Sequence, residues 1–135
     1  MAIRDATALP VVVVDDIDRA IIFYRDKLGL EVHRMDDAPD SAYVELGGGS
    51  GLVLYKSTFR RGDTTAATFV VDDVESAVRE LRSRGVTFED YDQPGLKTVN
   101  GVATMGQMKS AWFKDSGGNV IAVALDLRQL LRKAA

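Results

Sequence analysis

The sequence predicts an α+β fold of two βαβββ modules that form a curved mixed sheet around a cavity. The first observation is an internal repeat in the 135-residue chain, in which residues 13–21 align with residues 70–78. Each copy is a β-branched run followed by two aspartates and an apolar pattern with helical spacing. The second observation is that the apolar period changes from 3.6 to 2 residues after each helical pattern. One such module cannot bury its own sheet, so the two must pack together.

The length predicts a single domain, residues 1–135. Module one is expected at about 8–57 and module two at about 65–125. In the segment 126–135, Leu127, Leu130 and Leu131 recur at helical spacing. This predicts a C-terminal amphipathic helix that docks on the domain or on a partner.

The first module begins with a buried strand at 11–14. The aspartates at 15 and 16 supply an N-cap, and an apolar stripe from Ile17 to Leu28 predicts a helix that ends at Gly29. Strands are expected at 30–35, 41–46 and 52–55, with a glycine-rich turn between the last two.

The second module repeats this order, with a strand at 68–71, a helix from Val74 to Leu81, and Gly85 after the helix. Strands are expected at 86–91, 110–114 and 120–124. Asp115 and Asn119 are expected to hydrogen-bond to their own backbone in the turn between the last two strands. The segment 92–109 shows little periodicity, which predicts an irregular lid over a site.

The composition excludes several classes of function. Seventeen Lys and Arg residues against twenty Asp and Glu residues give a net charge of −3 without a basic cluster, so nucleic-acid binding is not expected. The chain has no cysteine, which excludes disulfides, thiolate metal sites and a cysteine nucleophile. No apolar run approaches the ~18 residues of a membrane span, and no signal peptide is recognised at residues 1–7. A cytoplasmic protein without membrane association is therefore expected.

Two segments carry a family resemblance. FYRDKLGLEV at residues 23–32 resembles a helix-to-strand signature of the vicinal-oxygen-chelate superfamily, the glyoxalase/bleomycin resistance protein/dioxygenase group. WFKDSGGN at residues 112–119 is similar to the turn signature of that group, with Ser116 and Gly117 where Pro and Asp are usual. With the repeat, the resemblance covers about residues 9–125. It implies the glyoxalase/bleomycin-resistance/dioxygenase fold, but fold alone does not determine function.

The resemblance also implies four positions for a divalent metal, one pair in each module. They fall on Leu9, on Leu54 or a neighbour, on Ala66 and on Ala122, none of which carries a metal ligand. With one histidine and no cysteine, a two-histidine site or a tetrahedral zinc site within one chain is not available. An all-oxygen site would have to use the aspartates at 36, 37 and 40, which are expected in an exposed loop. A metal-free protein without a cofactor is expected.

If the four metal positions point inward, the alternation of side chains along each strand places other small and apolar residues on the concave face with them. The resulting set is Leu9, Val11, Val13, Leu52, Leu54, Ala66, Thr68, Val70, Val120 and Ala122. These residues either leave a ligand cavity or pack a closed core. Aromatic side chains offer stacking faces, and the methionines of the 92–109 segment suit an adaptable lining. The expected ligand-binding residues are His33, Tyr43, Leu54, Tyr55, Phe59, Ala66, Thr68, Met105, Met108, Trp112 and Ala122; catalytic residues are not identified.

The first functional hypothesis is a metal-free protein that binds a small amphipathic or aromatic molecule in the sheet cavity. The alternative is a metal-independent lyase, isomerase or oxygenase-like enzyme, with His33 or a tyrosine as acid–base group. A third hypothesis is a divergent metalloenzyme. The resemblance also implies a homodimer, because members of the group commonly pair.

Overall fold

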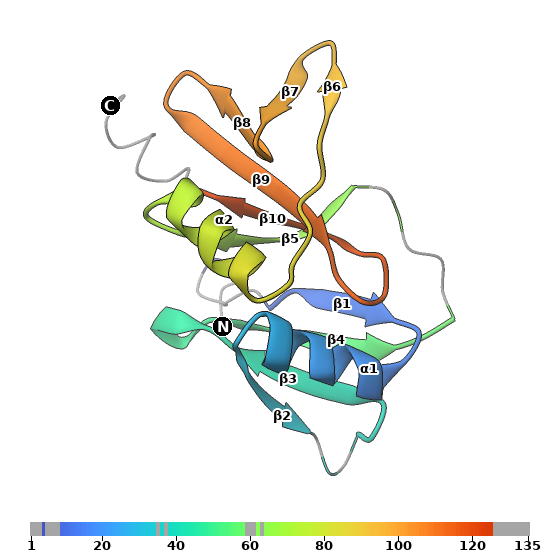
Figure 1. Cartoon of the computed structure of the whole chain (residues 1–135). Coiled ribbons are helices and arrows are strands. Elements are labelled where there is room, and N and C mark those ends of the chain that lie inside the picture. Colours follow the sequence, from blue (N-terminus) through green and yellow to red (C-terminus); the bar gives the residue numbers. More distant parts are fainter. Residues whose placement is uncertain are drawn as a thin grey trace.

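The computed structural model describes Arg4 and residues 9–125, except 35, 37, 59–61 and 63, as two mixed sheets with two helices (Figure 1). The first sheet has the order β1-β4-β3-β2. Its strands are β1 (Val11–Val14), β2 (Glu31–Arg34), β3 (Ser41–Glu45) and β4 (Gly51–Lys56). β1 pairs with β4 in parallel, and the other two pairings are antiparallel. This is the first βαβββ module.

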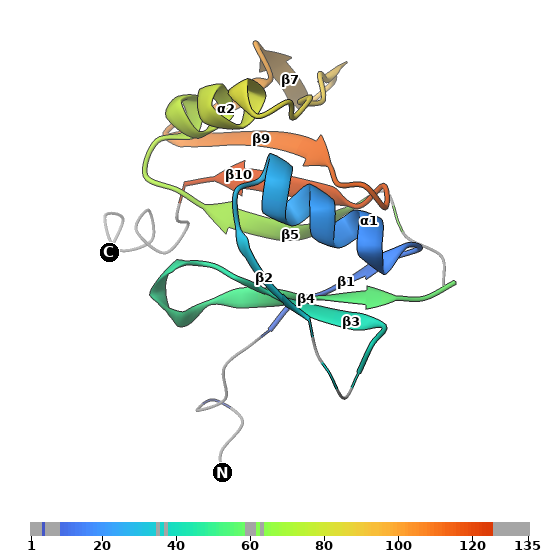
Figure 2. The same cartoon turned by 60° about the horizontal axis from the view of Figure 1, so that its bottom comes forward.

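The second sheet has the order β5-β10-β9-β8-β7-β6. Its strands are β5 (Thr65–Val70), β6 (Asp92–Gln93), β7 (Leu96–Val99), β8 (Val102–Met105), β9 (Met108–Lys114) and β10 (Val120–Ala124). β5 pairs with β10 in parallel, as β1 does with β4. The predicted α+β fold is therefore confirmed, but as two sheets rather than one. Their edge strands β1 and β5 lie side by side in both views (Figures 1 and 2).

The two helices begin as the repeated aspartates predict. α1 (Ile17–Ile22) starts after Asp16, whose carboxylate accepts a hydrogen bond from the Arg19 amide at 3.0 Å. α2 (Val74–Ser83) starts after Asp73, which accepts from the Ser76 amide at the same distance. Each cap satisfies a backbone N–H at the positive end of a helix. After α1 the chain continues in a π-helical turn at Phe23–Lys27.

Two expectations for the second module are wrong. No strand forms at 86–91, where Phe88 makes only an isolated bridge to Phe113. The segment 92–109 is not irregular, because it contains β6, β7, β8 and the start of β9. These strands are two to four residues long before β9, so a period of 2 has too few repeats to be recognised. Their turns contain the dipeptides Pro94-Gly95 and Asn100-Gly101, which are typical of tight turns.

The two modules share one hydrophobic core, which includes side chains of α1 and α2 and the faces of both sheets that pack on them. Tyr24 is fully buried at its centre, and its hydroxyl donates to Asp115 Oδ2 at 2.7 Å. Asp115 also accepts from the Gly117 and Asn119 amides, as predicted for this turn. The expectation for Asn119 is wrong, because its Nδ2 donates to the Val13 carbonyl of the other module at 2.6 Å rather than to the backbone of its own turn. This group of hydrogen bonds joins the modules across the core.

Burial, followed by the negative charge of Asp115, raises the pKa of Tyr24 well above its ordinary value of about 10. The folded state therefore holds this proton more tightly than the unfolded state. The contribution of the protonated Tyr24 hydroxyl to the free energy of unfolding is fully present below pH ~10. Above that pH it falls by up to about 1.4 kcal/mol per pH unit.

We expect the Tyr24 hydroxyl to ionise at alkaline pH only when the protein unfolds, because it is fully buried. The rise in tyrosinate absorbance that accompanies the loss of near-ultraviolet circular dichroism should be smaller by one tyrosine in the Tyr24→Phe variant. A difference of one ionised tyrosine between the two proteins while the circular dichroism is still native would contradict the prediction.

None of the described helices is long and apolar enough to cross a membrane. The C-terminal helix predicted at 126–135 lies outside the described residues.

Candidate functional site

Each sheet has one face on the hydrophobic core and one face turned away from it, which we call the open face. Alternate residues of a strand point to opposite faces, and residues paired across strands point to the same face. In β9, Ala111 and Phe113 are buried in the core, so Trp112 lies on the open face. The same reasoning assigns the other strand residues to one face or the other, except at the β-bulge between Thr65 and Ala67, where the register with β10 shifts by one residue.

The open face of the second sheet brings together six of the expected site residues. Ala122 of β10 pairs with Trp112 on one side and with Thr68 of β5 on the other, so the three form a row across adjacent strands. Met105 and Met108 form the last pair of the β8–β9 hairpin, on the same side. Ala66 precedes Thr68 by two residues in β5. The Trp112 indole thus stands beside small side chains, of which Thr68 and Ala66 are exposed and Ala122 is buried.

The open face of the first sheet carries three more of the expected residues. His33 of β2 pairs with Tyr43 of β3, which pairs with Val53 of β4. The His33 and Tyr43 rings are stacked with centroids 6.4 Å apart and an interplanar angle of 23°. Tyr55 lies on the same face of β4 and is 43% exposed. Aromatic surface is therefore available on both open faces.

The prediction that Leu52 and Leu54 line the concave face is wrong. Both are buried in the core, and Leu54 is fully inaccessible. Their neighbours Val53 and Tyr55 occupy the open face instead. The error is a shift of one residue in β4, which exchanges the two faces of a strand. Phe59, the remaining expected residue, lies outside the described part of the chain.

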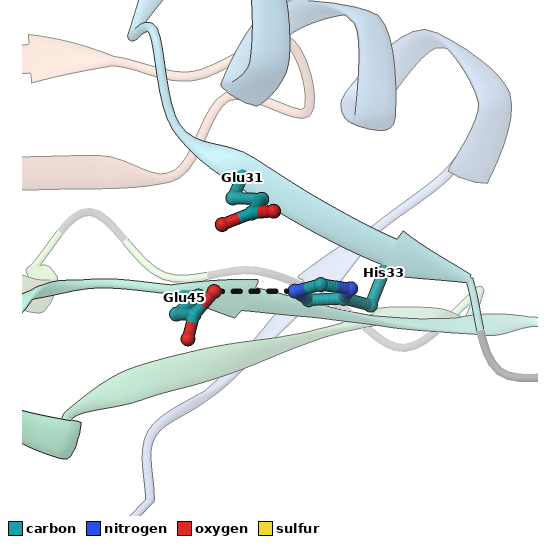
Figure 3. Close-up of side chains that lie close together, drawn as sticks. All are labelled: Glu31, His33 and Glu45. Atoms are coloured by element: carbon teal, nitrogen blue, oxygen red, sulfur yellow. Dashed lines mark hydrogen bonds and ion pairs between the residues drawn. The ribbon is translucent and has the colours of Figure 1, made fainter.

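Figure 3 shows Glu31, His33 and Glu45 close together on the side of the first sheet away from α1. Glu31 and Glu45 are paired across β2 and β3, and His33 follows Glu31 by two residues. His33 Nε2 lies 3.3 Å from Glu45 Oε2, and one ligand atom of each residue lies within 4.8 Å of the others. The hydrogen bond with His33 is the main cause that holds the pKa of the Glu45 carboxyl below its usual range.

This group has the donor types that a divalent cation or the N–H group of an organic ligand would use. All three side chains are exposed. The sequence singled out His33 but missed both glutamates. The alternation of Glu31 and His33 in one strand was visible, whereas the pairing with Glu45 depends on the register of the β2–β3 hairpin.

The four metal positions that the resemblance implies do not fit a metal in this fold. Ala66 and Ala122 do lie together on the open face of the second sheet, and Leu9 precedes β1. In β4, the open-face neighbours of Leu54 are Val53 and Tyr55, neither of which supplies a carboxylate or an imidazole. The Glu31–His33–Glu45 group lies on β2 and β3, away from these four positions.

A cavity of about 580 Å³ lies at the junction of the two sheets. It is lined by Pro10 before β1, by residues 46–48 and 50–52 around the β3–β4 turn, and by residues 67–70 along the edge of β5, so both faces of β5 contribute. Pockets for small organic ligands have volumes of about 300–1,000 Å³. The open-face residues Thr68 and Val70 therefore border a space large enough for such a ligand.

Several solved structures have a similar fold. UcmS2 is 21% identical with a TM-score of 0.69, over 90% of this chain and 99% of that one. A glyoxalase/bleomycin resistance protein from Streptomyces sp. CB03234 is 25% identical with a TM-score of 0.64, over 87% and 98%. The fosfomycin resistance protein FosX from Listeria monocytogenes, in complex with Mn(II) and 1S,2S-dihydroxypropylphosphonic acid, is 14% identical with a TM-score of 0.62, over 97% and 98%.

Comparison with curated protein sequences gives no significant match. The sequence pattern of one family, however, matches residues 6–123, which is most of the chain. The helix caps and the turn signature described above fall within this range, as do both modules except for the end of β10. The chain belongs to the Glyoxalase/Bleomycin resistance protein/Dioxygenase superfamily.

Proposed function

We propose that this protein binds a small amphipathic or aromatic molecule against the open faces of its sheets, without a metal at the positions the superfamily implies. The observation that carries the proposal is the row of Trp112, Ala122 and Thr68, with Ala66 beside it. An aromatic wall beside small side chains leaves room for a flat ligand, and the missing metal ligands leave that room unobstructed.

A ligand that buries about 300 Å² of apolar surface gains several kcal/mol at about 25 cal/mol per Å², before the costs of association. Micromolar affinity is therefore reasonable from apolar contacts alone. The Glu31–His33–Glu45 group offers polar contacts at a separate place, on β2 and β3 of the first sheet, where carboxylates accept hydrogen bonds and the imidazole can donate or accept one.

The alternative is a metal-independent lyase, isomerase or oxygenase-like enzyme that uses the Glu31–His33–Glu45 group on the open face of the first sheet. The observation in its favour is the contact of His33 with Glu45, because a carboxylate that orients an imidazole is typical of acid–base catalysis. An activity whose pH–rate profile loses one limb in His33→Ala, while Glu89→Gln leaves the profile unchanged, would favour the enzyme over the binding protein.

The binding proposal is tested with N-phenyl-1-naphthylamine, a neutral aromatic probe. The chain has a single tryptophan, so a change in its fluorescence reports binding of the probe near Trp112, and loss of that change in Ala66→Phe locates the probe on the open face of the second sheet. We expect saturable quenching of Trp112 by this probe at micromolar concentrations. Binding without any change in the emission of Trp112 would place the ligand elsewhere and contradict the proposal.

We expect the purified protein to hold less than about one tenth of a zinc, iron, nickel or manganese ion per chain after dialysis, since exposed ligands compete poorly with water for a cation. Elemental analysis measures this content. A value near one ion per chain would contradict the proposal of a metal-free protein. If Glu31→Gln and Glu45→Gln then abolished that binding, the Glu31–His33–Glu45 group would be the metal site.

We further propose a homodimer, because large apolar side chains outside the proposed ligand surface remain exposed in the single chain. Val11 of the edge strand β1 and Ile22 of α1 are each more than half exposed. Light scattering at micromolar concentration should give twice the 14.7 kDa mass of one chain. A mass of 14.7 kDa under those conditions would exclude the dimer.

A further inference from the structure

A second cavity, of about 680 Å³, lies on the core-facing side of the second sheet, between α2 and the β7–β8 hairpin. One wall is a helical stripe of α2 formed by Glu75, Val78, Arg79 and Arg82. The other wall is the hairpin, with Lys97, Val99, Asn100, Val102 and Thr104. We call this space the α2–hairpin cleft.

The cleft is separate from the site proposed above. In β8, Val102 and Thr104 line the cleft, whereas Met105 points to the opposite face of the sheet. A molecule in the cleft and a molecule on the open face would therefore lie on opposite sides of the same strands.

The charge of the cleft is opposite to that of the whole protein, which has a net charge of −3. Its one carboxylate, Glu75, is paired with Lys109 of β9, and this hydrogen bond holds the pKa of Glu75 below its usual range. Within the described part of the chain, Arg79, Arg82 and Lys97 form no ion pair with a carboxylate. Three unneutralised cations around one cavity favour an anion.

Two contacts within the protein position the Arg82 guanidinium in the absence of a ligand. Its Nη2 donates to the Asn100 carbonyl at 3.0 Å, and its guanidinium carbon lies 5.7 Å from the centre of the Phe88 ring. These contacts use one of its five N–H donors. Asn100 has a positive φ of 52° in the hairpin turn, which fixes the loop beside the guanidinium. A pre-positioned guanidinium loses little freedom when it binds an oxyanion.

The rest of the lining is apolar or donates hydrogen bonds. Val78 is almost fully buried, whereas Val99 is 66% exposed. Val99 pairs with Val102, so the two form an apolar patch beside the cations. The Asn100 amide and the Thr104 hydroxyl supply further donors.

We propose that the α2–hairpin cleft binds a small organic anion, a phosphate or carboxylate group carried by a compact apolar body. The anionic group contacts Arg79, Arg82 and Lys97, and the apolar body covers Val99 and Val102. This binding does not depend on the open-face ligand or on the oligomeric state.

The test uses phenyl phosphate, benzoate, inorganic phosphate and the neutral compound phenol, titrated by calorimetry into the full chain. Amide chemical shifts in NMR spectra report the location. We expect phenyl phosphate or benzoate to bind at sub-millimolar concentration and to shift the amides of Asn100 and Gly101. Inorganic phosphate should bind more weakly, and phenol should not bind. Added salt should weaken the binding.

The variant Arg79→Gln/Lys97→Gln removes two charges but leaves Arg82 and its support of the turn. We expect it to weaken phenyl phosphate binding at least about tenfold, because two charge-assisted contacts are lost. The control is Arg84→Gln/Lys114→Gln, which changes the net charge equally at cations paired with Glu80 and Glu89 outside the cleft. This control should bind as the unchanged protein does.

The proposal is overturned if neither organic anion binds at millimolar concentration, or if both double variants lose affinity equally. It is also overturned if the shifts fall on Trp112 and Thr68 instead of Asn100 and Gly101. A titration with N-phenyl-1-naphthylamine distinguishes the two sites, because the double variant in the cleft should leave Trp112 quenching unchanged. Failure at one site therefore says nothing against the other.

Discussion

Replacing Asp115 with alanine is expected to lower the free energy of unfolding by about 3–5 kcal/mol, because several buried donors lose their acceptor at once. The Asp115 side chain accepts from the Tyr24 hydroxyl, from the Gly117 and Asn119 amides, and from Asn119 Nδ2. Asp115 and Asn119 are buried, so water cannot replace the carboxylate freely. The two modules would also lose a direct connection across the core.

Urea denaturation of the variant measures this loss. Two comparisons separate the causes. Tyr24→Phe removes one donor and leaves the turn intact, so it should cost about 1–2 kcal/mol. Asp72→Ala removes an exposed carboxylate after β5 and should change stability by less than about 0.5 kcal/mol. If Asp115→Ala cost no more than Asp72→Ala, the hydrogen bonds of Asp115 would not be what stabilises the contact between modules.

The repeat, the helix caps and the turn at Asp115 could be predicted from the sequence because each depends on residues close together in the chain. Asp16 caps a helix amide three residues away, and Asp115 binds amides two and four residues away. The contact of Tyr24 with Asp115 spans 91 residues, and no local pattern indicates it. This contact forms only when one module packs on the other.

The errors at the site have a similar origin. Assigning Leu54 to the open face required the register of β4 to within one residue, and the apolar pattern of residues 52–55 does not provide it. The neighbouring residue Tyr55 was predicted to bind a ligand because of its aromatic ring, and it lies on the open face. Glu31 and Glu45 were missed because each looks like an ordinary exposed charge until the hairpin register places them opposite each other.

The second large effect is expected for Ala66→Phe, which should weaken binding of N-phenyl-1-naphthylamine by at least about tenfold without unfolding the protein. Ala66 is exposed on the open face of β5, two residues from Thr68. A phenyl ring there occupies open-face space next to Thr68 and Val120, at the β5 end of the row that the ligand would use. Since no core side chain is displaced, the stability should change by less than about 0.5 kcal/mol.

Ala122→Phe introduces the same side chain at a buried position of the same face, so a larger loss of stability is expected. Ala122 is only 5% exposed, between Trp112 and Thr68 in the middle of the second sheet. A ring at this position must move its neighbours, so a loss of stability of about 1–3 kcal/mol is expected in addition to the loss of binding. Because the two effects occur together, this variant is less decisive than Ala66→Phe.

The matched control is Thr104→Phe, in β8 of the same sheet. Thr104 is also exposed, and its pairing with Lys109 places it on the face toward α2, opposite to Met105. The control adds a phenyl ring to the other face of the sheet and should leave Trp112 quenching by the probe unchanged. If both variants bound the probe as the unchanged protein does, the open face would not be the ligand site. If Ala66→Phe unfolded the protein, Ala66 would belong to a closed interface, and the space beside Trp112 would be packing rather than a cavity.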